Sequence, residues 1–240
     1  YKMTTSGSTV FNVTRDQLIT GALRMLGVVA QGETPTTAQI TEAAEALNML
    51  VKAYEADGMP LWGIETYGIS LVAGQATYVI GTGQTINIPK PLKVIQAWNR
   101  VLSSNIDIPM RILTKQEYNI LGNKTTGGNP IQLYYQPKLT YGELTVFPVP
   151  TSAEQAQNKI YIVYQRPFED FIASGDNPDF PQEWLDALKY GLAARLAPEY
   201  GIPSDQRMIL IREAKEIKEQ ALSFGTEEGS LYFQYDRRGY

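Results

Sequence analysis

The chain has 240 residues, a formal net charge of -4 and 43% hydrophobic residues, enough apolar content to bury a core in one domain or two small ones. It contains neither histidine nor cysteine. This excludes disulfides, imidazole-dependent triads and the commonest catalytic zinc and non-haem iron ligand sets. The acidic balance argues against tight nonspecific binding to DNA phosphates. Any catalysis would have to use carboxylates, Lys, Tyr or Ser-Lys pairs, and we expect no cofactor and no metal site.

The sequence also bears on where the protein works. It has no run of about 18 apolar residues and no basic segment followed by an apolar one at its start. We therefore expect neither a membrane span nor a secretory signal. The expected location is a cytoplasm, or a particle assembled there.

The first elements in chain order are a polar arm and two helices. Residues 1–12 are rich in Ser, Thr and Gly without periodicity, which is typical of an extended arm that orders only against a partner. Two capping boxes follow, and each predicts the start of a helix that a glycine closes. The first box is Thr14 with Gln17, and Gly27 closes its helix. The second box is Thr36 with Gln39, and Gly58 closes its helix. The short loop between the helices favours an antiparallel hairpin.

From about Trp62 to Phe168 the apolar period changes from near 3.6 to near 2, which indicates a β module of seven short strands. The expected strands are 64–72, 76–80, 92–101, 106–112, 131–136, 143–146 and 159–165. Both faces of the last strand are partly apolar, as in a small antiparallel sandwich or barrel. We expect a short helix over 115–121. Prolines cannot extend a ladder, so we expect an exposed loop over 148–158.

Helical patterning returns near Pro181, which presets a first-turn φ, while Asp179 and Gln182 can cap the exposed donors. The apolar residues that follow recur every four positions and spread beyond one stripe, so this helix must be covered on more than one side. The recurring set is Trp184, Leu188, Leu192 and Leu196. Pro198 and Gly201 end the helix.

A last helix is expected from Ser204 to about Phe224. Its predicted buried stripe is Met208, Ile211, Ala214, Ile217, Ala221 and Phe224. Two charge pairs at four-residue spacing, Arg212 with Glu216 and Lys215 with Glu219, are expected on its other side.

Two helices before the β module and two after it predict one four-helix unit with a β insertion, because neither hairpin alone can bury its stripe. The expected fold class is therefore α+β, with two helical hairpins and extended arms. The predicted domains are an N-terminal arm (1–12), a discontinuous helical domain (13–60 and 178–225), an inserted β domain (61–177) and a C-terminal arm (226–240).

Two sets of residues are candidates for binding partners. The C-terminal arm combines aromatic and basic residues, and Tyr and Arg anchor interfaces most often. Its candidates are Leu231, Tyr232, Phe233, Tyr235, Arg237, Arg238 and Tyr240. The candidates for a subunit interface are Trp184, Leu188, Tyr190, Leu192 and Arg195. For Trp184 the alternative is a place in the subunit's own core, and for Arg195 a place at the helix boundary.

Several segments resemble the head-to-tail adaptor family of short-tailed bacteriophages, also called packaged-DNA stabilisation or tail accessory proteins. The segments are Ala22 to Val28, Ala46 to Leu50 with Asp57-Gly58, Phe180-Pro181-Gln182-Glu183-Trp184, Leu188 to Ala193, and Leu196 to Gly201. The resemblance falls in both halves of the helical unit. The β insertion is larger than in the most compact members, which leaves the role of the insertion open.

This resemblance implies a non-enzymatic virion protein that forms a ring, dodecameric in this family, beneath the portal. Helices would pack between neighbouring subunits, and the C-terminal arm would reach onto the portal protein. The ring would extend the DNA channel, help retain packaged DNA and dock the tail nozzle or tube. Double-stranded DNA would pass through without sequence readout.

Two alternatives remain open on the residues alone. A glycan hydrolase would need a pair of carboxylates as acid and base, with candidates Glu65, Asp107, Glu117, Asp170 and Asp176. A glycan-binding β module would use exposed tyrosines, with candidates Tyr134, Tyr135 and Tyr141. Tyrosine in strands is more often ordinary cross-strand packing.

Overall fold

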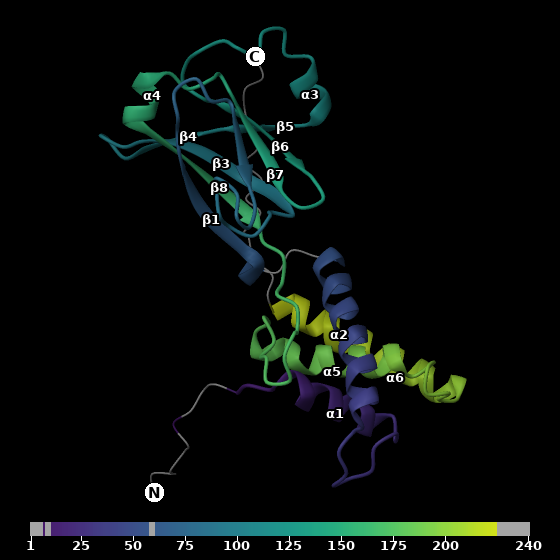
Figure 1. The fold of residues 1–240 in the computed structure, drawn as a ribbon. Helices are drawn as coiled ribbons and strands as arrows, with labels where there is room; N and C mark the ends of the chain where they lie inside the picture. Colours follow the sequence, from purple (N-terminus) through teal and green to yellow (C-terminus); the bar gives the residue numbers. More distant parts are fainter. Residues whose placement is uncertain (1–6, 8–10, 58–60, 225–240) are drawn as a thin grey trace, which may run out of the picture. The chain divides into compact units, whose positions relative to one another are not determined.

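The computed structural model describes residues 7, 11–57 and 61–224, and the chain divides into two compact units (Figure 1). A helical unit comprises residues 1–56 and 169–240, and a β unit comprises residues 57–168. The described residues contain six α-helices and two sheets of four strands, so the fold is α+β as predicted. The predicted boundaries of the two arms, the helical domain and the β domain remain predictions, because they state which segments fold independently.

The helical unit is built from four long helices. They are α1 (Arg15–Met25), α2 (Thr37–Asp57), α5 (Leu185–Leu196) and α6 (Ser204–Phe224). Both predicted capping boxes are confirmed. The Gln17 amide donates to Thr14 Oγ1 at 3.4 Å, and the Gln39 amide donates to Thr36 Oγ1 at 3.3 Å. Before α5, residues Gln182–Trp184 form a 3-10 turn (η2) whose N-cap, Pro181, makes no side-chain capping bond.

A close approach between α2 and α5 holds this unit together. Tyr54 lies over Gly191, where a Cβ would overlap the tyrosine hydroxyl and come within 3.0 Å of Leu50 Cδ2. The Tyr54 hydroxyl donates to the Ala187 carbonyl at 3.2 Å, and its ring meets the Trp184 ring edge-on at 5.9 Å. Glycine is therefore required at position 191 because only a bare backbone lets the two helices approach so closely.

The chain that returns from the β unit is tied to α1 and α2. Asn48 donates to the Phe171 carbonyl at 3.0 Å and accepts from the Phe171 amide at 2.9 Å, so one side chain satisfies both backbone groups. Asp176 accepts from the amides of Ile172 and Ala173 at 2.7 and 2.6 Å. These amide bonds lower the pKa of Asp176, since they favour the ionised carboxylate.

The β unit is a sandwich of two four-stranded sheets (Figure 1). The first has the order β1 (Ile64–Ser70), β8 (Asn158–Gln165), β3 (Lys93–Val101), β4 (Ile106–Pro109). The second has the order β2 (Thr77–Ile80), β7 (Gly142–Phe147), β6 (Gln132–Pro137), β5 (Arg111–Leu113). The core between them includes the fully buried side chains of Ile80, Leu133, Leu144, Ile160 and Ile162.

Of the two predicted forms, sandwich and barrel, the structure is the sandwich, because the two sheets stay separate within the described residues. The β unit differs from the prediction in two respects. Strand β5 pairs with β6 in parallel, while the other strand pairs are antiparallel. The single strand expected over 106–112 is two strands in different sheets. The chain crosses between the sheets at Met110, whose amide donates to the Ala97 carbonyl at 2.9 Å.

Three short helices complete the β unit: η1 (Leu61–Gly63), α3 (Lys115–Asn119) and α4 (Ser152–Gln157). The prediction of an exposed loop over 148–158 is wrong. Thr151 and Glu154 form a capping box that starts α4, with the Thr151 amide donating to the Glu154 carboxylate at 2.9 Å. Pro150 is buried just before this helix.

The contact at Gly191 predicts a cost for any added side-chain atom. We expect Gly191→Ala to lower the free energy of unfolding by about 1–3 kcal/mol, because overpacking outweighs the gain in helix propensity. Urea denaturation measures the change. In a Tyr54→Phe background the same substitution should cost less, since the overlapped hydroxyl is gone.

Gly21 in α1 provides the matched control, because a Cβ there would meet only the flexible end of Lys189 at 3.3 Å. Gly21→Ala should be neutral or stabilising. Equal losses from the two substitutions would show that the Tyr54 contact does not set the spacing of α2 and α5.

The lowered pKa of Asp176 predicts a pH dependence. The folded protein holds the carboxylate more favourably than the unfolded chain does, so its stabilisation is present above the ordinary aspartate pKa of about 4 and is lost as pH falls through the lower folded value. Asp176→Asn should therefore be less stable than wild type at pH 7, and the gap should close in acid. Urea denaturation of both proteins from pH 7 into acid measures this difference in the free energy of unfolding. A gap at Asp176 that is independent of pH would contradict the assignment.

Candidate assembly surfaces

The structure places the predicted interface residues of α5 mostly inside the subunit. Trp184, Leu188 and Leu192 are buried, Tyr190 is half-buried and Arg195 is exposed. Trp184 packs between Tyr54 and Phe180, with its ring 5.8 Å from the second. Helix α5 is covered by α1, α2 and α6, which explains why its sequence is apolar nearly all round. Within one subunit, only Tyr190 and Arg195 of this set reach the surface.

The aromatic and basic residues predicted to form a portal-binding arm, Leu231, Tyr232, Phe233, Tyr235, Arg237, Arg238 and Tyr240, lie outside the described residues. Their role stays a prediction.

The outer face of α6 carries exposed apolar side chains that the sequence placed in the core. Met208, Ile211 and Phe224 are 65%, 51% and 76% exposed, so the predicted stripe is wrong at these three positions. The prediction is confirmed at Ala214 and Ala221, which are the buried residues of this helix. Small side chains allow close packing against α5, which turns the larger ones outward.

Two features extend this α6 face. The pairs Arg212–Glu216 and Lys215–Glu219 span 3.9 and 3.7 Å on the surface, where such pairs contribute little stability. An apolar hollow of about 230 Å³ lies beside Ile209. Its lining residues are Met25, Leu26, Ile202, Gln206, Ile209 and Leu210. Helix α6 therefore carries protruding apolar side chains and also borders a recess that Met25, Leu26 and Ile202 help to line.

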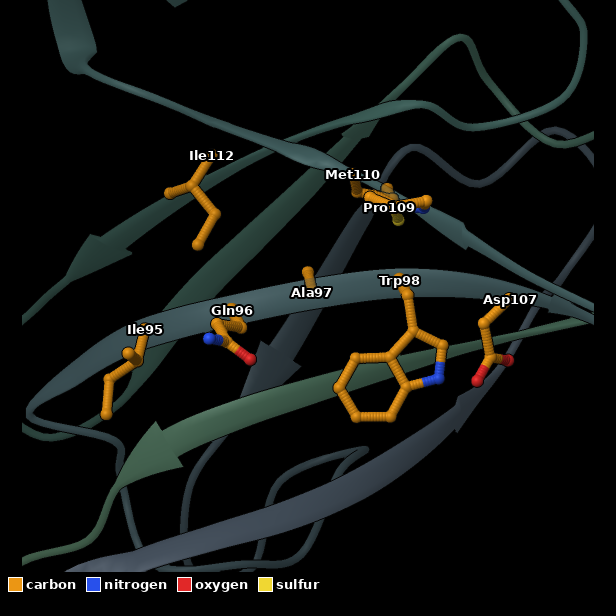
Figure 2. A pocket seen from close by; sticks show the side chains of 8 residues that line it. All are labelled: Ile95, Gln96, Ala97, Trp98, Asp107, Pro109, Met110 and Ile112. Atoms are coloured by element: carbon orange, nitrogen blue, oxygen red, sulfur yellow. The ribbon is translucent and has the colours of Figure 1, made fainter. Parts of the chain in front are cut away.

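The β unit has a larger hollow at the edge of its first sheet, with a volume of about 580 Å³ (Figure 2). Its lining residues are Ile95, Gln96, Ala97, Trp98, Asp107, Pro109, Met110 and Ile112. Trp98 is stacked on Tyr161, with ring centroids 5.6 Å apart and planes 8° apart. The guanidinium of Arg100 lies 4.7 Å from the centre of the Tyr161 ring and binds Asp107 through two nitrogens at 2.6 and 2.7 Å.

The five carboxylates considered for glycan cleavage are engaged in structural contacts. Their partners are Arg166 and Tyr164 for Glu65, Arg100 for Asp107, Arg111 and Thr114 for Glu117, Lys52 for Asp170, and backbone amides for Asp176. Hydrogen bonds to Arg100 lower the pKa of Asp107, and those to Thr114 lower the pKa of Glu117. A general acid needs the opposite shift. Within the described ranges, no three Asp or Glu side chains gather to hold a metal ion.

The tyrosines considered for glycan binding are packing residues. Tyr134 is buried and stacks on Tyr118 with centroids 4.9 Å apart. Tyr135 donates its hydroxyl to the Pro91 carbonyl, and burial raises its pKa to about 12. Tyr141 is half-buried. These three side chains therefore form no exposed platform.

The α6 face predicts a contrast in stability. Met208→Glu and Ile211→Glu should change the free energy of unfolding by no more than about 0.5 kcal/mol, because these side chains are solvated in the subunit. Leu188→Ala, in the core, should cost about 2–5 kcal/mol. Urea denaturation of dilute protein measures all three. A large loss at Met208 or Ile211 would show that the α6 face supports the subunit's own fold.

Comparisons with known proteins bear on identity. No described helix combines the length and apolar content that a membrane crossing requires. A search of curated proteins finds no match. The profile of the SU10 adaptor protein family matches residues 13–223, which include most of both units. The chain therefore belongs to the SU10 adaptor protein family, a family of phage adaptor proteins, as its resemblance to head-to-tail adaptors indicated.

Proposed function

We propose that this protein is the head-to-tail adaptor of a bacteriophage, a structural protein of the virion. Subunits form a ring beneath the portal, which extends the DNA channel, helps retain packaged DNA and docks the tail nozzle or tube. The observation that carries this proposal is the family match, because it spans residues 13–223 and so includes the β insertion as well as the helices.

The α6 face supports association between subunits. Three large exposed apolar side chains lie on α6, and the same helix borders an apolar recess. Exposed apolar surface of this kind marks interaction sites. A protrusion on one part of a surface that fits a recess on another gives a head-to-tail contact, and such a contact closes a ring when the rotation between neighbouring subunits divides a full turn evenly. The proposed ring is a dodecamer.

The acidic chain suits a channel through which DNA slides. Its net charge of -4 disfavours the release of counterions from phosphates that makes basic proteins grip DNA. Retention of packaged DNA would then come from closure of the tail below the ring. Contacts with DNA would carry no sequence readout.

The C-terminal arm is proposed to bind the portal protein. Its seven candidate residues combine aromatic anchors with two arginines, the composition of interface hot spots. On α5, Tyr190 and Arg195 are proposed to meet the neighbouring subunit directly. The buried residues Trp184, Leu188 and Leu192 would contribute indirectly, because they anchor α5 in the core and so position Tyr190 and Arg195.

Native mass spectrometry and negative-stain imaging test the ring, with and without purified portal. We expect a ring of twelve chains that binds the portal. Met208→Glu with Ile211→Glu should leave the fold intact and reduce ring formation at least tenfold. The matched control is Lys215→Glu with Glu219→Lys, which reverses an exposed pair on the same helix and should leave assembly unchanged.

Deletion of residues 228–240 tests the arm separately. The truncated chain should fold and form rings but lose attachment to the portal. Unchanged attachment would show that the arm is not the portal contact, and a monomer indifferent to portal would count against the adaptor function as a whole.

A further inference from the structure

The two units of the chain carry net charges of opposite sign. The β unit, residues 57–168, contains nine Lys and Arg against six Asp and Glu, which gives a net charge of +3. The helical unit, residues 1–56 and 169–240, contains twelve against nineteen, which gives a net charge of -7. The acidity of the chain therefore belongs to the helical unit, and an anionic partner would be attracted to the β unit.

The surplus positive charge of the β unit comes from lysines that have no carboxylate partner. Four carboxylates of this unit form ion pairs with Arg166, Arg100, Arg111 and Lys138. Among the residues that the structure describes there, the lysines outside such pairs are Lys90, Lys93, Lys115, Lys124 and Lys159. Their charges are therefore available to an anion from outside the subunit.

Lys159 lies in a row of polar side chains across the outer face of the first sheet. Side chains alternate along a strand, and its neighbour Ile160 faces the core, so Lys159 faces outward. Lys159 is the cross-strand partner of Arg100 in β3 and of Ser70 in β1, and Arg100 is in turn the partner of Asp107 in β4. We call these four residues, which come from all four strands, the basic row.

The ammonium of Lys159 is held in position without a carboxylate. It lies 5.8 Å from the centre of the Tyr161 ring, and the guanidinium carbon of Arg100 lies 4.7 Å from the same centre. Gly68 in β1 makes room for this lysine, because a Cβ at position 68 would come within 2.7 Å of Lys159 Cε. The glycine and the aromatic ring therefore determine where the positive charge lies.

Arg100 and Lys159 are like charges at directly opposite positions of neighbouring strands, an arrangement that destabilises a sheet. Asp107 compensates one of the two charges, since Arg100 donates to it through two nitrogens. The other positive charge has no compensating carboxylate in the row. An anion bound here would relieve the repulsion and would find donors on Arg100, Lys159 and Ser70.

We propose that the basic row binds backbone phosphates of the DNA that passes through the ring. This inference rests on the proposed function and assigns the DNA contact to one surface of the β unit. Basic side chains and hydroxyls bind phosphates without reading bases, in agreement with a contact that carries no sequence readout. One surplus positive charge per row gives a weak contact, so the DNA can still slide.

Fluorescence anisotropy with a labelled DNA duplex tests the site on the full chain, in a salt series that starts at about 50 mM. Lys159→Gln should weaken binding about fivefold or more, because one phosphate contact is lost. The slope of log K against log salt should become shallower by about 1.

The matched control is Lys115→Gln, which removes the same charge from α3, a helix that packs against the second sheet. It should leave the slope unchanged. Equal losses in the two variants would show that net charge alone decides binding, and would overturn the site.

A variant that changes no charge gives a second measurement. Gly68→Ala should weaken DNA binding by a similar factor, because the added Cβ displaces Lys159. Gly122→Ala is its control, since a Cβ there would meet nothing within 4 Å. Thermal unfolding shows whether both variants keep the fold. Unchanged binding by a folded Gly68→Ala protein would overturn the role given to the position of Lys159.

Native mass spectrometry of the same samples separates the site from the ring. Rings that do not bind DNA, or that bind it equally well with Lys159→Gln, would overturn the phosphate site and leave the adaptor proposal in place. A monomer indifferent to portal would count against the adaptor. If Lys159→Gln and not Lys115→Gln weakened DNA binding by that monomer, the phosphate site would still be supported.

Discussion

The helical unit depends on the contact between Tyr54 and Gly191. The tyrosine reaches from α2 across the bare backbone of α5, donates to the Ala187 carbonyl and meets the Trp184 ring. Lys218 of α6 lies 4.7 Å from the centre of the same ring. One side chain therefore contacts three helices, and the approach that a glycine permits brings them within its reach. The packing of α5 on every side follows from this arrangement.

The position of α5 changes which surface can assemble. A helix that is apolar nearly all round suggests a partner molecule when it is seen alone in the sequence. In the structure its own neighbours cover it, and Met208, Ile211 and Phe224 of α6 are exposed instead. Periodicity identified both helices, and it placed Met208, Ile211, Ala214 and Ala221 in one stripe of α6, of which only the two alanines are buried. Contact with α5 decides which residues of the stripe are buried.

In the β unit the strands were predictable and their assignment to sheets was not. Alternation located the strands within a few residues, since each buries one face. Pro109 interrupts the expected strand 106–112, and proline in a strand is a signal for an edge or a break. Thr151 with Glu154 has the spacing of a capping box and could have predicted α4. The hollow beside Trp98 had no local signal in the sequence, because residues of three strands, β3, β4 and β5, line it together.

Cross-strand pairing of Ile64 with Gln165 brings the two ends of the β unit side by side. The Arg166 amide donates to the Gly63 carbonyl at 2.9 Å, and Trp62 is stacked on Phe168 with centroids 5.9 Å apart, which fastens the same point. The β unit therefore connects the helices as a short loop would, although it has more than a hundred residues. The entropy cost of bringing its two ends together is offset by contacts inside the β unit itself. Evolution could therefore enlarge, shorten or replace the β unit while leaving the helical unit unchanged.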